Sequence, residues 1–249
     1  MASFWTKKNE DIEDEKTANP WAEMLVNGKV LYPKRRLLKA ALFDLDGTLV
    51  DTEGQYSVFW GAVGRKYRPD IPNLELLIKG STLTRIYDTY FPDPEVQAAI
   101  TEELDKWEAQ MDYAFFPGAL DFLRDLKAHG VKCAVVTSSN IPKMNSLARQ
   151  HPEFNSLFVR VLTAEDFPAS KPAPDCYLLA AKLMDAALDE CVVFEDAFNG
   201  LEAGMSSGIF TVGLATYNKP EAIKDKCHHV LNDFVGMTYE KLTDIINQP

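Results

Sequence analysis

The sequence has few cysteines, no long apolar run and no signal-peptide pattern. Its four cysteines (Cys133, Cys176, Cys191 and Cys227) form no C-x-x-C pair, and two of them lie in apolar runs that we expect to be buried strands. Buried, reduced thiols are typical of the cytosol. No apolar run approaches the length of a membrane span, and the N-terminus lacks the apolar core of a signal peptide. We therefore expect a cytoplasmic protein with no membrane partner.

Basic residues are also in the minority. There are 26 lysines and arginines against 37 acidic residues, which gives a formal net charge of −11. This charge argues against nucleic acid or an anionic membrane as a partner, and it means that local cations must hold any phosphorylated substrate. No G-x-G-x-x-G motif follows an apolar run, which argues against a dinucleotide-dependent dehydrogenase. A length of 249 residues leaves room for one or two domains.

The most informative stretch is an apolar run that ends in two carboxylates, Asp44 and Asp46, followed by Gly47. A short apolar run bounded by a turn signal predicts a buried strand. Two acids after such a strand fit a helix N-cap with a turn, a calcium loop, or a nucleophile with a general acid at a magnesium site. A calcium loop requires Gly at its sixth position and Glu at its twelfth, where this chain has Leu49 and Gln55. The other two interpretations stay open on this stretch alone.

Three later segments supply the partners that a magnesium site would need. An apolar run leads into Thr137, a lysine at Lys171 precedes a predicted helix, and another apolar run ends in Glu195 and Asp196. Each segment alone is weak evidence. Together with the two aspartates they resemble the four motifs of the haloacid dehalogenase-like phosphohydrolase superfamily, over roughly residues 38–235.

That resemblance implies how a phosphate ester would be cleaved. Asp44 would attack phosphorus to form an aspartyl-phosphate, and Asp46 would protonate the leaving group and then activate water. Thr137, with the Ser138 backbone, would bind the phosphoryl oxygens, and Lys171 would hold nucleophile and phosphate together. A carboxylate repels a phosphate by about 4 kcal/mol at about 4 Å and an effective dielectric of about 20, so a cation is needed between them. The implied cation is Mg²⁺, held by the side chains of Asp44, Glu195 and Asp196 and the backbone carbonyl of Asp46.

The patterns divide the chain into three parts. Residues 54–113 are charged and helical in pattern, whereas strand and helix patterns alternate from residue 114 onward, which predicts a parallel sheet covered by helices. The resemblance implies an α/β fold, with a Rossmann-like parallel sheet core at 37–53 and 114–249, helices on both faces, and a small inserted α-helical cap at 54–113. Residues 1–36 are an N-terminal extension that we expect to be partly disordered. Core strands are expected at 131–137, 157–162, 191–195 and 209–213.

The choice of substrate would depend on the residues around this centre. In the superfamily, phosphatases often carry Thr two residues after the second aspartate, here Thr48, whereas related sugar phosphomutases tend to have Val. Those mutases also usually have His at the place of Tyr56. The segment around Lys79 and Gly80 resembles the substrate-selecting loop of β-phosphoglucomutase-like relatives. The implied substrate contacts are Thr48, Lys79, Gly80, Arg85, Ser138 and Asn140.

These observations predict a magnesium-dependent phosphatase of a small phosphorylated metabolite, with a sugar or polyol phosphate as substrate. A β-phosphoglucomutase-like sugar phosphomutase and a non-catalytic module that binds a phosphate ligand are the alternatives. Replacing Asp44 by Asn removes the nucleophile and keeps its shape. We expect this change to abolish turnover, whereas unchanged behaviour would favour the binding module. Neither a heptad pattern nor an interface helix predicts an oligomeric state.

Overall fold

The computed structural model describes residues 25–26, 29–30 and 37–248. In the N-terminal unit, residues 1–35, β1 (Leu25–Val26) pairs with β2 (Lys29–Val30) in an antiparallel two-stranded sheet. In the sequence, Asn27-Gly28 separates these two strands, and this dipeptide is typical of two-residue hairpin connections. The rest of the N-terminal extension, including its expected disorder, lies outside the described residues. All other elements belong to a second unit that begins at residue 36.

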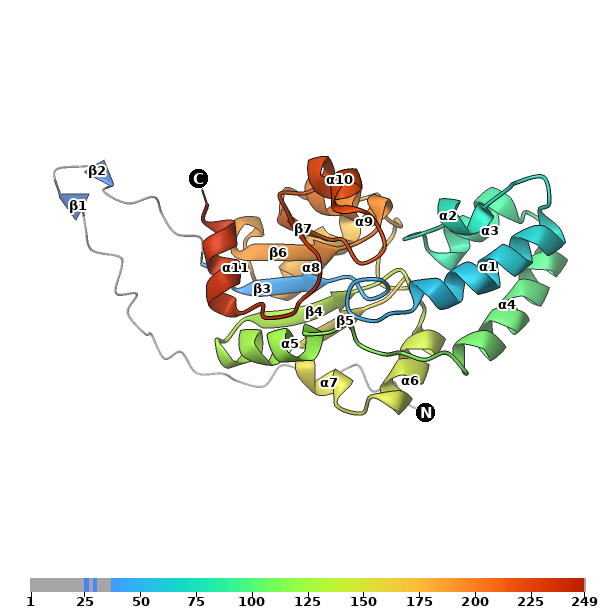
Figure 1. Cartoon of the computed structure of the whole chain (residues 1–249), viewed down its shortest axis with the longest axis horizontal. Helices are drawn as coiled ribbons and strands as arrows, with labels where there is room; N and C mark the ends of the chain where they lie inside the picture. The colour runs from blue at the N-terminus through green and yellow to red at the C-terminus, as the bar shows by residue number, and fades with distance from the viewer. Residues whose placement is uncertain (1–24, 27–28, 31–36, 249) are drawn as a thin grey trace. The chain divides into compact units, whose positions relative to one another are not determined.

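Six parallel strands form the sheet of the second unit, in the order β5-β4-β3-β6-β7-β8 (Figure 1). β3 lies between β4 and β6, and Ala41 stands opposite Cys133 on one side and Val192 on the other. In such sheets ligands bind at the carboxyl ends of the strands where the strand order reverses, here around β3. The strands are β3 (Ala40–Phe43), β4 (Lys132–Val136), β5 (Arg160–Leu162), β6 (Cys191–Glu195), β7 (Phe210–Leu214) and β8 (His229–Leu231).

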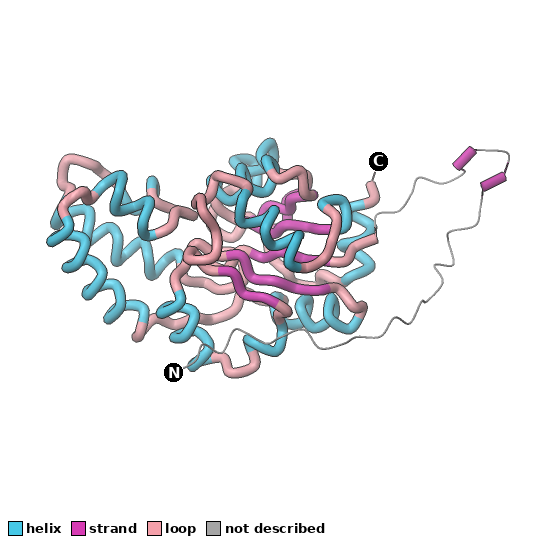
Figure 2. The backbone as a smooth tube through the Cα atoms, turned by 180° about the vertical axis from the view of Figure 1, so that it is seen from behind, coloured by secondary structure: helices cyan, strands magenta, loops and turns pink. Residues whose placement is uncertain are grey.

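Helices cover both faces of the sheet because its central strands are apolar on both sides (Figure 2). Alternate residues of β3 point to opposite faces, so Ala41 and Phe43 belong to one core and Ala40 and Leu42 to the other. Burying a ring such as Phe43 stabilises the fold by roughly 1.5–3 kcal/mol. The first core packs against α5 (Ala119–Ala128), α6 (Ile141–Gln150), α7 (Phe154–Leu157) and α11 (Tyr239–Ile246), and the second against α8 (Asp175–Leu183) and α9 (Phe198–Ser206). Three short turns complete the fold: η1 (Leu188–Glu190), α10 (Pro220–Ile223) and η2 (Lys224–Lys226).

Between β3 and α5 the chain forms a helical insertion with a core of its own. Its helices are α1 (Glu53–Tyr67), α2 (Leu74–Leu77), α3 (Leu83–Tyr90) and α4 (Pro94–Glu108), which Figure 1 shows grouped together. Apolar residues at helical spacing face inward, including Trp60 and Val63 of α1 and Ile100 and Leu104 of α4. Asp93 begins α4 by accepting a hydrogen bond from the Glu95 backbone, and Pro94 follows it at the first helical position.

The insertion joins the rest of the unit through two adjacent segments. Val50 and Phe115 form an antiparallel bridge, and the Asp51 backbone N–H donates to the Ala114 carbonyl at 2.8 Å. The chain therefore leaves the sheet and returns to it at nearly the same place, and a short pair of extended segments supports the insertion.

Most of the expected elements are present, and the differences are local. Strands predicted at 131–137, 191–195 and 209–213 agree with β4, β6 and β7 to within one residue at each end. The strand predicted at 157–162 begins later, because Leu157 ends the short helix α7. β8 was not predicted, since its three residues offer too short a pattern to read. None of the helices in the described part of the chain is long and apolar enough to cross a membrane.

Candidate active site

Three neighbouring strands end in polar residues at one edge of the sheet. Asp44 follows β3, Thr137 follows β4, and β6 ends in Glu195, with Asp196 next in the chain. All four residues are buried. Since parallel strands end at a common edge, this topology brings together side chains that lie in three separate sequence motifs.

Lys171 connects two of these strand ends. Its Nζ donates to Asp44 Oδ1 and to Glu195 Oε1, each at 2.6 Å, and to the Val136 carbonyl at 3.0 Å. Tyr177 of α8 donates to the same Glu195 oxygen at 2.6 Å. The lysine side chain is 1% exposed, and burial alone would lower its pKa, but the charges of Asp44 and Glu195 outweigh burial and raise the pKa. Lys171 is therefore a fixed cation at the centre of the site.

Asp44, Glu195 and Asp196 form a buried carboxylate cluster, in which one oxygen of each lies within 4.8 Å of the others. Burial and the charge of Glu195 raise the pKa of the Asp44 carboxyl well above its usual range. Burial, with the charges of Glu53 and Asp44, does the same for Asp196. One lysine cannot balance three buried carboxylates, and uncompensated buried charge is costly. An all-oxygen donor set with excess negative charge fits a divalent cation such as Mg²⁺.

Two glycines leave the space that this cluster occupies. A Cβ at Gly47 would lie 2.2 Å from Asp196 Oδ2, and one at Gly200 would lie 2.0 Å from the Glu195 carboxylate. Gly47 also has a φ of +83°, which side-chain-bearing residues rarely adopt. Any larger residue at either position would push a carboxylate out of the cluster.

Asp46 is held differently from Asp44. Its Oδ1 accepts from the Thr52 hydroxyl and forms an ion pair with Lys143, and its Oδ2 accepts from the Ser139 hydroxyl at 2.8 Å. Burial opposes ionisation, but Lys143 with these hydroxyls outweighs it and lowers the pKa of the Asp46 carboxyl. The Asp46 side chain is therefore an ion-paired carboxylate outside the cluster, which leaves its backbone carbonyl as the group that could face a metal.

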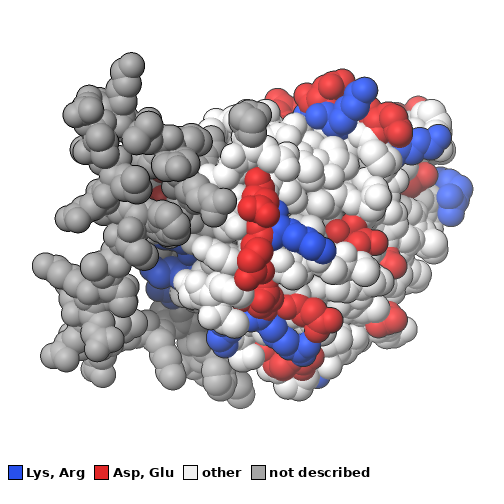
Figure 3. Space-filling view, turned by 60° about the vertical axis from the view of Figure 1, so that its left-hand side comes forward, with Lys and Arg blue, Asp and Glu red and all other residues white. Residues whose placement is uncertain are grey.

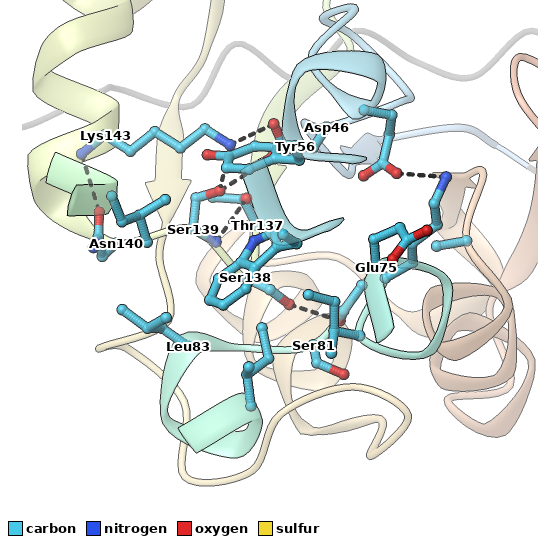
Figure 4. A pocket seen from close by; sticks show the side chains of 18 of the residues that line it. Asp46, Tyr56, Glu75, Ser81, Leu83, Thr137, Ser138, Ser139, Asn140 and Lys143 are labelled. Carbon is cyan, nitrogen blue, oxygen red and sulfur yellow. Dashed lines mark hydrogen bonds and ion pairs between the residues drawn. The ribbon is translucent and has the colours of Figure 1, made fainter. Parts of the chain in front are cut away.

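A pocket of about 110 Å³ opens between the strand ends and the helical insertion (Figure 4). Of the residues expected to contact substrate, Lys79, Gly80, Ser138 and Asn140 line it. Lys79 forms an ion pair with Glu53 at 2.8 Å. The Ser138 hydroxyl donates to the Gly80 carbonyl at 3.1 Å, which docks the insertion loop on the core. Asn140 caps α6 by accepting from the Lys143 backbone at 3.0 Å.

Two expected substrate contacts have other partners. Thr48 is fully buried, and its hydroxyl donates to Asp196 Oδ1 at 3.2 Å, so it orients a carboxylate of the cluster. Arg85 donates from Nη1 to the Lys171 carbonyl at 2.6 Å, which ties α3 to the loop that carries the central lysine. Neither side chain lines the pocket.

Sequence reasoning missed several polar residues at this site, chiefly Lys143, Ser139, Thr52 and Glu108. The sequence around Lys143 indicates an ordinary surface lysine in the first turn of a helix, but its side chain is 1% exposed. One signal was available: Ser139 and Lys143 are four residues apart, and across the start of a helix this spacing allows contact.

Comparisons with known proteins agree with this geometry. The family model described as haloacid dehalogenase-like hydrolase matches residues 38–208. The chain is 32% identical over 183 residues to hexitol phosphatase A of Escherichia coli, covering 71% of this chain and 82% of that protein. It is 28% identical over 213 residues to the bifunctional riboflavin kinase/FMN phosphatase of Arabidopsis thaliana, covering 83% of this chain but only 56% of that relative's length.

The fold is likewise that of solved structures. The β-phosphoglucomutase of Clostridium difficile superimposes with a TM-score of 0.71 at 23% identity, covering 85% of this chain and 98% of that one. The parallel sheet, the cluster at its carboxyl edge and the family match lead to one conclusion. The chain belongs to the haloacid dehalogenase-like hydrolase family.

Proposed function

We propose that this enzyme is a magnesium-dependent phosphatase that hydrolyses a sugar or polyol phosphate through an aspartyl-phosphate on Asp44. The observation that carries the proposal is the Lys171 ammonium, which lies 2.6 Å from both Glu195 and Asp44, and Asp44 lines the pocket of about 110 Å³. A buried cation fixed on a carboxylate suits attack on an anionic ester, because it offsets the repulsion between the two anions. Hexitol phosphatase A, a relative by sequence, supports the class of substrate.

The side chains divide the reaction between them. Lys171 on Oδ1 orients the Asp44 carboxylate and leaves Oδ2 as the attacking oxygen. Bound by Asp44, Glu195 and Asp196, Mg²⁺ would supply the charge that neutralises the phosphoryl group. Thr137 and the Ser138 backbone, which follow β4, would bind the phosphoryl oxygens. Asp46 would protonate the departing alkoxide and then take a proton from the water that hydrolyses the aspartyl-phosphate.

The charges that line the pocket favour an ester whose organic part is neutral. Five carboxylates and two lysines line it, and both lysines are already paired, Lys79 with Glu53 and Lys143 with Asp46. Among the described lining residues no cation remains for a second anionic group. The net charge of −11 gives no long-range attraction for an anion, so that attraction depends on the site's own cations. On another face, shown in Figure 3, acidic side chains form a band with basic ones among them. Carboxylates and hydroxyls suit a substrate rich in hydroxyl groups.

A sugar phosphomutase is the alternative, because the chain shares its fold with a β-phosphoglucomutase. Such an enzyme must hold a bisphosphate intermediate, whose second phosphate needs a cation at the far end of the pocket. Lys79 is already paired with Glu53, so it offers little free positive charge for a second phosphate. Tyr56, at the place of the usual mutase histidine, donates to Glu108 at 2.7 Å. These contacts support hydrolysis over transfer.

The test is release of inorganic phosphate from a panel of esters, with Mg²⁺ and with EDTA. Polyol and hexose monophosphates should be hydrolysed faster than phosphoglycolate or sugar bisphosphates, and only with metal present. Asp44→Asn should abolish turnover, and repeated turnover by this variant would refute the aspartyl-phosphate. Isomerised sugar phosphates without phosphate release would establish the mutase. A wild type that releases no phosphate and forms no isomer, with ligand binding that Asp44→Asn leaves unchanged, would establish a binding module.

The same proposal includes a cytoplasmic location. All four cysteines are free and buried, and this supports a reducing compartment. Fractionation of cells that express the tagged chain tests it, and recovery in an oxidising compartment would contradict it.

A further inference from the structure

Lys143 is a buried lysine that the proposed chemistry leaves unexplained. It lies in the first turn of α6, and its side chain is only 1% exposed. Its Nζ pairs with Asp46 and donates to the Ser139 hydroxyl at 3.0 Å. Burying an ammonium costs several kcal/mol unless it is well paired, so a lysine at this position needs a carboxylate partner at every stage of the reaction.

A second carboxylate lies close to Lys143. Glu108 ends α4 and is 5% exposed, and its Oε1 accepts from the Tyr56 hydroxyl at 2.7 Å. Lys143 Nζ lies 4.3 Å from the centre of the same tyrosine ring, and Figure 4 shows these two side chains together. Tyr56 therefore contacts both Lys143 and Glu108. Glu108 Oε2 is the only buried side-chain nitrogen or oxygen in the described part of the chain without a hydrogen-bond partner. Lys143 is therefore paired with one carboxylate, Asp46, and lies near a second, Glu108, that has one oxygen without a partner.

Asp46 needs to leave Lys143 if it is to act as an acid. Both of its oxygens accept hydrogen bonds, from Thr52, Ser139 and Lys143, so neither is free to carry a proton to a leaving group. When Asp46 turns to the leaving group, Lys143 loses its partner. The unpartnered oxygen of Glu108, Oε2, is the neighbouring group that can replace it.

We propose that Lys143 is a positioning residue that holds the Asp46 carboxylate between turnovers and exchanges it for Glu108 Oε2. Once released from Lys143, Asp46 takes up a proton from solvent and passes it to the leaving-group oxygen. The proposal rests on the proposed phosphatase function. The exchange keeps the buried ammonium paired throughout, and it gives the unpaired oxygen of Glu108 a partner. Because Lys143 belongs to α6 of the core and Glu108 to α4 of the insertion, the new contact joins these two parts as the proton moves from Asp46 to the leaving-group oxygen.

The test compares two esters that differ in their need for an acid. An alkyl phosphate has a poor leaving group and depends on Asp46, whereas p-nitrophenyl phosphate leaves without protonation. Lys143→Met should lower kcat for the alkyl ester by about 10- to 100-fold, and kcat for the aryl ester by no more than about threefold. KM should change little for either ester. Lys182→Met, the same change at an exposed lysine of α8, is the matched control.

Two further variants separate positioning from folding. Glu108→Gln keeps the acceptor for Tyr56 and removes the charge, so it should show the same ester preference to a smaller degree. In an Asp46→Asn background, Lys143→Met should cause no further loss for the alkyl ester. If Lys143→Met does not fold, Glu108→Gln decides the matter by itself.

The outcomes are distinct. Equal losses for both esters, or full additivity with Asp46→Asn, would overturn the positioning role and leave the phosphatase intact. An alkyl rate unchanged in Glu108→Gln would overturn the exchange of partners. No phosphate release by the wild-type enzyme would overturn the proposed function, and this proposal with it.

Discussion

Replacing the proposed nucleophile should stabilise the metal-free enzyme while it abolishes turnover. Asp44 is buried beside two other carboxylates, Glu195 and Asp196, and Lys171 is the cation paired with it. Asn has nearly the same shape as Asp and carries no charge. The variant Asp44→Asn therefore isolates the energetic cost of the charge from the cost of lost packing.

The magnitude follows from the distances. At 4.8 Å and an effective dielectric of about 20, each neighbouring carboxylate repels Asp44 by about 3.5 kcal/mol. Lys171 at 2.6 Å attracts it by about 6 kcal/mol on the same scale. Attraction and repulsion nearly cancel, so the desolvation of a buried charge, several kcal/mol, decides the sign. We expect the variant to be about 1–3 kcal/mol more stable than the wild type in EDTA. Each kcal/mol should raise Tm by roughly 2–4 °C.

Urea and thermal unfolding, each with EDTA and with Mg²⁺, would measure this difference. Magnesium at 100 times its Kd should stabilise the wild type by about 2.7 kcal/mol. Magnesium should stabilise the variant less, because one charged ligand is gone. The difference in stability between variant and wild type should therefore become smaller or change sign. The matched control is the exposed Asp225→Asn, which should change neither. If Asp44→Asn is less stable than the wild type in EDTA, the picture of an overcharged metal-free cluster is wrong.

Three other experiments test the metal site, the glycine beside the cluster and the burial of the thiols. Chelation should stop phosphate release and added Mg²⁺ should restore it, and activity that persists in EDTA would contradict the metal site. Gly47→Ala should destabilise the fold by about 1–3 kcal/mol and lower kcat, since its φ is strained and its Cβ overlaps Asp196; unfolding and rate measurements together check it. Burial raises the pKa of Cys133 to about 12 and of Cys176 to about 11. At pH 8 these thiols should stay unreactive toward Ellman's reagent until denaturant is added, and rapid native labelling would argue against their burial.

The centre of the site was predictable because its parts are marked by local sequence patterns. An apolar run followed at once by a polar residue identifies a strand and the side chain at its end, as with Asp44, Thr137 and Glu195. Parallel strands then place those ends together without any knowledge of side-chain packing. Lys171 follows the same logic at the start of a helix, and its ion pairs with two strand ends reflect the shared edge.

The surrounding contacts were not predictable because they depend on how helices pack. Lys143 and Glu108 are 35 residues apart in the printed sequence, and only the packing of α6 against α4 brings them near one pocket. Burial cannot be read from a lysine in a polar helical turn, where a solvated side chain is the common outcome. The predicted substrate contact of Arg85 fails for the same reason, because the position of α3 directs its side chain to the Lys171 carbonyl and not into the pocket.

The attachment of the helical insertion makes it a separable segment of the chain. Because Asp51 and Ala114 are hydrogen-bonded neighbours, a chain that ran directly from one to the other would close the sheet domain without stretching it. A gene could exchange everything between these two points while the carboxylates and the lysine kept their places on strands and loops outside it. The nucleophile, the central lysine and the carboxylate cluster are therefore independent of the exchanged segment, whereas Thr52 and Glu108, which lie within it, tie the hold on Asp46 to the insertion.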